Sequence, residues 1–248
     1  MKTTLNAGGT ETQTALRVTK RPANARGQTE LGWLHSRHSF TFGDYFDPEQ
    51  MGFRSLRVIN DDVLEPGGGF GMHPHKDAEI FSYVVEGELE HRDSMGNGSI
   101  IKAGDLQYMS AGRGVTHSEF NPLPDRRMRL LQIWLRPNVS GGEPRYAERA
   151  LGESAAANAL TLLFSGNPRN GAVAIRQDAD IYFGPLQTGQ KSTLDLEKDR
   201  GVWIQMMGGT VRVAGETIAD GDGLAITGAE RLEIVSDDDA KFLVFVLS

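Results

Sequence analysis

The sequence contains no cysteine among its 248 residues, which excludes disulfide bonds, thiolate zinc sites and iron–sulfur clusters. Long apolar runs are also missing. No stretch approaches the roughly 18 consecutive apolar residues of a membrane-spanning helix, and the first residues lack the apolar segment of a signal peptide. Lysine and arginine number 26 against 33 acidic residues, and the net charge of −7 argues against general binding to nucleic acid. We therefore expect a cytoplasmic protein with no membrane segment and no direct nucleic-acid partner.

Glycine, in contrast, is abundant. The 30 glycines separate short apolar runs, which is typical of many short strands joined by tight turns. Strand-rich segments are predicted at residues 54–60, 79–93, 98–112 and 128–137. In the second of these, Ile80 and Val84 on one face alternate with Phe81 and Tyr83 on the other. Both faces are apolar, which predicts a strand buried between two sheets.

The second half of the chain repeats the first. Residues 80–112 and 202–230 both run from an apolar strand through glycine, a polar strand and a turn to Gly-Asp and another apolar strand. This repeat predicts an all-β protein with two barrel domains, at residues 15–136 and 160–248, after a flexible arm at residues 1–14. Residues 137–159 form the predicted linker, in which Pro and Gly-Gly precede a helix-compatible stretch of Ala, Glu and Arg. All six histidines precede residue 118, so the second domain is expected to lack a histidine metal site.

Two short motifs carry the candidate chemistry. His73 and His75 follow a glycine-rich stretch, and His117 and Glu119 form a second pair, 42 residues later (117 − 75). Residues two apart on a strand point to the same face, roughly 6.6 Å apart. Each pair alone is more typical of a polar surface, but together three imidazoles and one carboxylate predict a site for a single divalent metal ion.

The same residues carry a resemblance to cupins, and more closely to pirins. Gly67, His73, His75, Glu79 and Gly87 match the first cupin motif, with one extra residue before the last glycine. The second motif is matched by Gly104, Gly112, His117 and Asn121, with Ser110 in place of proline and two extra residues before the histidine. Residues 73–119 resemble the N-terminal domain of pirins. Residues 132–148 and the strands after residue 202 are similar to bacterial pirin-like quercetin 2,3-dioxygenases.

This resemblance implies two cupin barrels and a metal ion held by His73, His75, His117 and Glu119. Many other cupins take the carboxylate from the Glu79 position, so Glu79 is the competing ligand; otherwise it is expected to hydrogen-bond nearby polar groups or to orient an imidazole. His35 and His38 are expected to have surface or structural roles, and His91, near a turn, to be solvated.

The implied reaction is opening of the flavonol ring by dioxygen, with Glu119 as general base. Iron(II) is the favoured ion, with nickel, cobalt, manganese, copper or zinc as alternatives. The partners are a flavonol-like aromatic substrate and dioxygen, and two barrels in one chain favour a monomer. The alternative is a metal-binding, redox-sensing regulatory protein without physiological turnover, because eukaryotic pirins are linked to transcriptional control.

Overall fold

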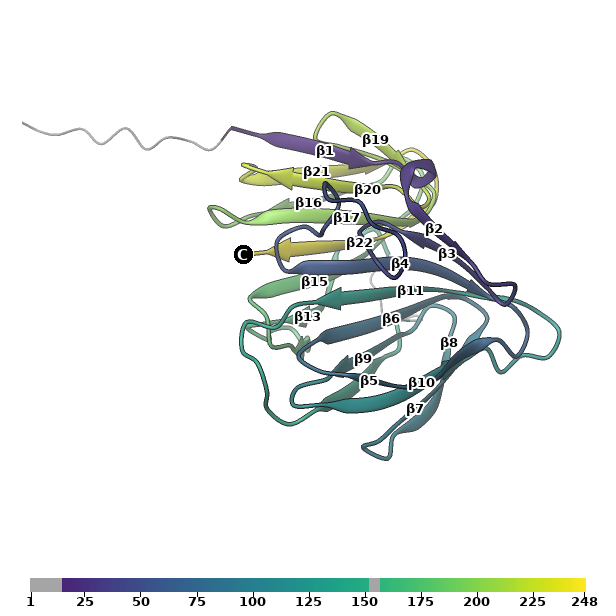
Figure 1. Ribbon diagram of the computed structural model, residues 1–248. Helices are drawn as coiled ribbons and strands as arrows, with labels where there is room; N and C mark the ends of the chain where they lie inside the picture. Colours follow the sequence, from purple (N-terminus) through teal and green to yellow (C-terminus); the bar gives the residue numbers. More distant parts are fainter. Residues whose placement is uncertain (1–14, 152–156) are drawn as a thin grey trace, which may run out of the picture.

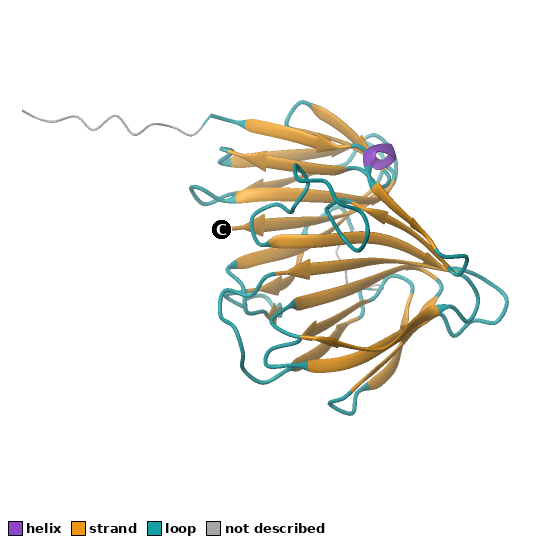
Figure 2. Ribbon diagram, in the orientation of Figure 1, coloured by secondary structure: helices purple, strands orange, loops and turns teal. Residues whose placement is uncertain are grey.

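The computed structural model describes residues 15–151 and 157–248, which form an almost entirely β protein (Figure 1). Among these residues the only helix is a single 3-10 turn at Ala23–Ala25 (η1), and none is long and apolar enough to cross a membrane (Figure 2). The predicted all-β class is therefore confirmed. The flexible arm predicted at residues 1–14 lies outside the described residues.

The first domain consists of a seven-stranded sheet packed against a four-stranded sheet. The large sheet has the order β12-β9-β6-β11-β4-β3-β2, and the small one the order β5-β10-β7-β8. The strands are β2 (Gly27–Glu30), β3 (Leu34–His38), β4 (Leu56–Leu64), β5 (Gly69–His75), β6 (Glu79–Glu86), β7 (Glu88–Asp93), β8 (Gly98–Lys102), β9 (Leu106–Ser110), β10 (Val115–Phe120), β11 (Met128–Leu135) and β12 (Arg145–Arg149).

The second domain repeats this arrangement. Its sheets have the orders β1-β20-β17-β22-β15-β13-β14 and β16-β21-β18-β19. The strands are β1 (Arg17–Arg21), β13 (Thr161–Ser165), β14 (Val173–Ala174), β15 (Ala179–Leu186), β16 (Lys191–Asp195), β17 (Gly201–Gly208), β18 (Thr210–Val213), β19 (Glu216–Ala219), β20 (Gly223–Thr227), β21 (Arg231–Ser236) and β22 (Ala240–Leu247). One apolar cluster that includes Val202, Ile204, Ile234 and Phe242 lies within this domain.

Strand β6 explains how the two domains share one core. Ile80 and Val84 pack within the first domain, whereas Phe81 and Tyr83, on the other face, join a cluster that includes Phe164 of the second domain. The rings of Phe81 and Phe164 meet edge to face with their centroids 4.9 Å apart. Burial on both faces accounts for the unbroken apolar run, because each side chain removes its surface from water.

The ends of the first domain differ from the predicted division. Strand β1 pairs with β20 of the second domain, so the start of the described chain completes the second domain's sheet. In the predicted linker, Arg145–Arg149 do not form a helix but form strand β12, which pairs with β9 and becomes the edge of the large sheet. A short helix is marginal by itself, and the free edge of β9 offers backbone hydrogen bonds that stabilise the extended form.

Candidate metal centre

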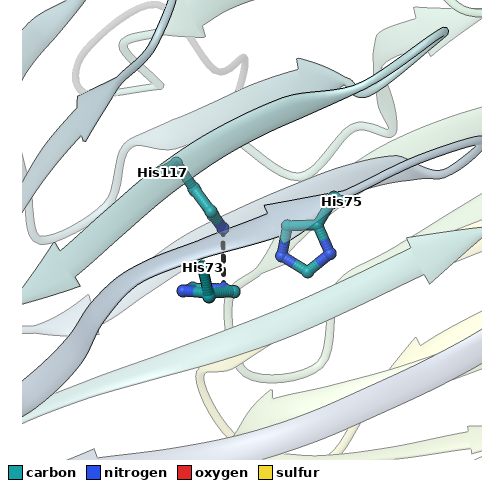
Figure 3. Close-up of side chains that lie close together, drawn as sticks. All are labelled: His73, His75 and His117. Carbon is teal, nitrogen blue, oxygen red and sulfur yellow. Dashed lines mark hydrogen bonds between the residues drawn. The ribbon is translucent and has the colours of Figure 1, made fainter.

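Three histidines from two neighbouring strands converge on one point (Figure 3). His73 and His75 lie on β5, and His117 lies on β10, opposite His73 in the antiparallel register. Their ligand nitrogens lie within 4.8 Å of one another, and Nε2 of His117 is 3.1 Å from Nε2 of His73. The structure thus brings together all three histidines that the two motifs contributed.

The glycine-rich stretch before His73 lets β5 approach β10 closely. A Cβ atom on Gly69 would lie only 2.4 Å from the carbonyl oxygen of Glu119 and 2.5 Å from the ring of Phe120. Any larger residue at this position would push the two strands apart. The close strand pairing that sets the histidine spacing therefore depends on glycine here.

The electrostatics of His75 and His117 suit a cation. Burial lowers the pKa of His75 to about 3, and the neighbouring imidazoles of His117 and His73 act in the same direction. Burial and neighbouring imidazoles likewise lower the pKa of His117 to about 3. Both rings are therefore neutral at pH 7, and each offers one nitrogen lone pair.

The spacing also fits a transition metal. Two nitrogens that each lie about 2.1 Å from one ion, at a right angle, are about 3 Å apart. The 3.1 Å between Nε2 of His73 and Nε2 of His117 matches this value. Nδ1 of His73 donates to the backbone carbonyl of Gly71 at 2.8 Å, which leaves its Nε2 lone pair directed at the shared point. Imidazole ligands suit zinc, copper, iron and nickel.

Glu119 points inward from β10 beside the histidines and is 1% exposed. Its two carboxylate oxygens accept hydrogen bonds from Oγ of Ser82 and from Nε2 of Gln132, each at 2.7 Å. Burial raises the pKa of Glu119, while the hydrogen bond from Ser82 and the nearby histidines oppose this rise. The ligand atoms that lie within 4.8 Å of one another belong to the three imidazoles. The carboxylate of Glu119 is held by its hydrogen bonds to Ser82 and Gln132.

Glu79, the competing ligand, has a different environment. Its carboxylate accepts hydrogen bonds from the hydroxyls of Tyr108 and Ser110 and from the backbone N–H of Arg176 in the second domain. It shares the face of β6 that carries Phe81, which packs against the second domain. Glu79 therefore ties the two domains together and orients none of the three imidazoles.

His91 was expected to be solvated, and this expectation is wrong. The side chain is fully buried, Nε2 lies 3.2 Å from Nδ1 of His117, and the ring stacks on Tyr146 with centroids 5.1 Å apart. The inward alternation of Leu89, His91 and Asp93 along β7 is the signal that could have revealed this position.

The two remaining histidines have structural roles, as expected. His38 is buried, with Nδ1 2.7 Å from Oδ1 of Asn60 and Nε2 2.8 Å from the hydroxyl of Thr29. His35 is partly exposed and lies between the carboxylates of Glu30 and Glu65.

An aromatic wall borders the third histidine. The ring of Trp134 meets His75 edge to face with centroids 4.9 Å apart, and Phe42 meets Trp134 in the same way at 5.6 Å. Phe42 and Trp134 are both partly exposed, so flat apolar surface lies next to the cluster.

Comparison with protein families matches residues 19–135 to the model described as Pirin and residues 162–247 to the quercetinase C-terminal cupin domain. The chain is also 45% identical to "Quercetin 2,3-dioxygenase" of Escherichia coli K12 over 227 residues, which covers 92% of this chain and 97% of that protein. This chain belongs to the pirin family. The "Pirin-like protein" of Caulobacter vibrioides is a further relative of this pirin, 35% identical over 92% of the chain and 98% of that protein.

Solved structures agree with this assignment. YhhW from Escherichia coli superimposes on this pirin with a TM-score of 0.90 and 44% identity, covering 94% of this chain and 98% of that one. The bacterial pirin YhhW in complex with nickel(II) gives a TM-score of 0.89 at the same identity, covering 93% of this chain and 99% of that one. The predicted pair of cupin barrels is therefore confirmed.

Proposed function

We propose that this pirin is a metal-dependent dioxygenase that opens the heterocyclic ring of a flavonol such as quercetin with dioxygen. The observation that carries the proposal is the convergence of three imidazoles, two of them held neutral by burial, beside a buried carboxylate. The relatives named quercetin 2,3-dioxygenase support the reaction class, and the nickel complex of YhhW supports a divalent metal.

In this proposal His73, His75, His117 and Glu119 hold one divalent ion, with iron(II) as the native metal. When bound there, such an ion would supply Lewis acidity toward a flavonol oxygen and a template for the reaction with dioxygen. The protein contributes neutral nitrogen donors and one negative charge, so the site retains net positive charge that favours a deprotonated flavonol.

Glu119 also serves as the general base that accepts the proton of the flavonol 3-hydroxyl group. Burial raises the pKa of Glu119, which strengthens its affinity for this proton. Oγ of Ser82 lies 2.7 Å from Oε1 of Glu119 and 3.2 Å from Oε1 of Gln132. When Glu119 is ionised the hydroxyl donates to it, and when Glu119 is protonated the hydroxyl accepts from it and donates to Gln132. Ser82 therefore satisfies both protonation states.

The aromatic wall provides the place for the substrate. Trp134 and Phe42 present partly exposed rings beside His75, and offset or edge-on contacts with a flat aromatic substrate contribute about 0.5–1.5 kcal/mol each. This orientation directs the polar edge of the flavonol toward the three histidines.

The test is turnover of quercetin, followed by its visible absorbance, with protein loaded anaerobically with iron(II) or nickel(II) before oxygen is admitted. The proposal expects loss of quercetin that requires bound metal and is abolished in His117→Ala. His35→Ala, outside the metal cluster, is the matched control and should retain turnover. Metal binding without turnover of any flavonol would contradict the proposal and favour a redox-sensing regulatory role.

We also propose that the protein is a monomer. The apolar cluster between the two large sheets joins both domains of one chain, which supports pairing of the barrels within the chain. Light scattering coupled to size-exclusion chromatography should give the mass of one chain, 27.1 kDa, and a stable dimer would contradict the proposal.

A further inference from the structure

We infer that His91 is a positioning residue: it accepts a hydrogen bond from Nδ1 of His117 and so fixes the tautomer in which Nε2 of His117 offers its lone pair to a metal ion. The inference deepens the proposed function, because it rests on the metal site formed by His73, His75 and His117.

Both nitrogens of His117 have close partners. Nε2 lies 3.1 Å from Nε2 of His73, at the shared point of the cluster, and Nδ1 lies 3.2 Å from Nε2 of His91. A neutral imidazole carries one N–H and one lone pair. If the lone pair is on Nε2 and available to a cation, the proton must be on Nδ1, and His91 is the side chain placed to accept it.

His91 is held firmly in this position. It points inward from β7, it is 0% exposed, and its ring lies nearly parallel to that of Tyr146, at an interplanar angle of 23°. Within the described part of the chain its other nitrogen, Nδ1, has no hydrogen-bond partner. The hydrogen bond to His117 is therefore the one polar side-chain interaction of His91 in these ranges.

His117 and His73 are oriented by different kinds of hydrogen-bond acceptor. His73 donates to a backbone carbonyl, a fixed acceptor that no side-chain substitution removes. The partner of His117 is a neutral side chain, so substitution of His91 tests the contribution of this hydrogen bond directly. Partners of this kind typically change metal affinity by about 10–100-fold.

The experiment measures binding of cobalt(II), by its visible absorption and by competition with a chelating dye. His91→Phe keeps a ring against Tyr146 and removes the acceptor, whereas His91→Gln restores an acceptor at about the same reach. The expected result is at least a tenfold loss of cobalt affinity and an altered spectrum in His91→Phe. His91→Gln should remain within about threefold of the wild type. Tyr146→Phe, which keeps the stacked ring, should bind as the wild type does.

Equal affinity and spectrum in His91→Phe and the wild type would overturn the inference, as would an equal loss in His91→Gln. If His91→Phe does not fold, His91→Asn replaces it, because its shorter amide falls short of His117 while remaining polar. Failure of the wild type to bind cobalt(II) or nickel(II) would instead overturn the metal site itself, and with it the proposed function. The two failures are therefore distinguishable without an activity assay.

Discussion

Asp62, on β4, should make the stability of the protein fall between weakly acidic and weakly basic pH. The side chain is 2% exposed, the hydroxyl of Ser36 donates to its carboxyl group, and its Oδ1 has no hydrogen-bond partner in the described ranges. Burial raises the pKa of Asp62 from 3.8 to about 7, and the charges of Asp61 and Glu119 add to this rise. The difference corresponds to roughly 4 kcal/mol of preference for the protonated form.

Because the pKa is raised in the folded state, the stabilisation by protonated Asp62 is complete below the unfolded value near 3.8 and is lost as the pH rises through about 7. Between pH 5 and pH 8 the wild type should lose roughly 2–3 kcal/mol from this group. The side chain of Asp62→Asn does not ionise. The difference in unfolding free energy between Asp62→Asn and the wild type should therefore be larger at pH 8 than at pH 5 by roughly 2–3 kcal/mol, in favour of the variant.

Urea unfolding at pH 5 and pH 8 measures this difference directly. Asp44→Asn, on an exposed loop, serves as the matched control and should leave the pH dependence unchanged. An Asp62→Asn protein whose gain is the same at both pH values, or which is destabilised at pH 8, would refute the reasoning.

Three further substitutions separate the roles of the buried side chains. Glu79→Gln should retain metal, and its free energy of unfolding should fall by about 1.5–3 kcal/mol in thermal or urea unfolding, because the substitution weakens charged hydrogen bonds to Tyr108 and the second domain. Loss of metal in Glu79→Gln would contradict the structural role given to Glu79. Glu119→Gln should lower metal affinity by at least about tenfold in a chelator competition, and unchanged affinity would remove Glu119 from the ligand set. Ser82→Ala should keep metal but lower kcat for quercetin by about tenfold or more, and an unchanged kcat would show that the hydroxyl plays no part in proton transfer.

Two-residue spacing on a strand places side chains on one face regardless of the rest of the fold, which is why His73 and His75 lie together on β5. His117 meets them because β10 pairs with β5, a contact between segments distant in sequence that the family resemblance implied. The same periodicity applies to His91, but its closeness to the turn after β7 suggested solvent exposure. In the structure, Tyr146 from β12 packs over the His91 ring and covers it.

The environment of Glu79 could be identified only from the tertiary structure. On β6, Glu79 shares its face with Phe81, but both faces of that strand are apolar, so alternation does not say which face lines the first domain. The second domain covers the Phe81 face and provides the N–H of Arg176.

The pairing of β1 with β20 could not be predicted from the sequence either. It joins residues about 200 positions apart, such as Arg21 and Gly223, and no local signal encodes that contact.

The basic run at residues 126–129 provides a smaller example of the same limit. A charge run of this kind is typical of a solvated turn, and Arg126 and Arg127 are indeed exposed. Arg129 instead lies within β11 and forms ion pairs with Asp61 of the first domain and Asp220 of the second. Its partners are distant in sequence, so charge patterning could not identify this link between the domains.

The most direct test of the proposed function is the stoichiometry of the reaction. Iron(II)-loaded protein should consume one dioxygen and release one carbon monoxide for each quercetin lost, as measured with an oxygen electrode and by gas analysis. Metal-free protein and His73→Ala should show none of the three changes. Oxygen uptake without carbon monoxide, or equal uptake by His73→Ala, would contradict a ring-opening dioxygenase at the three-histidine site.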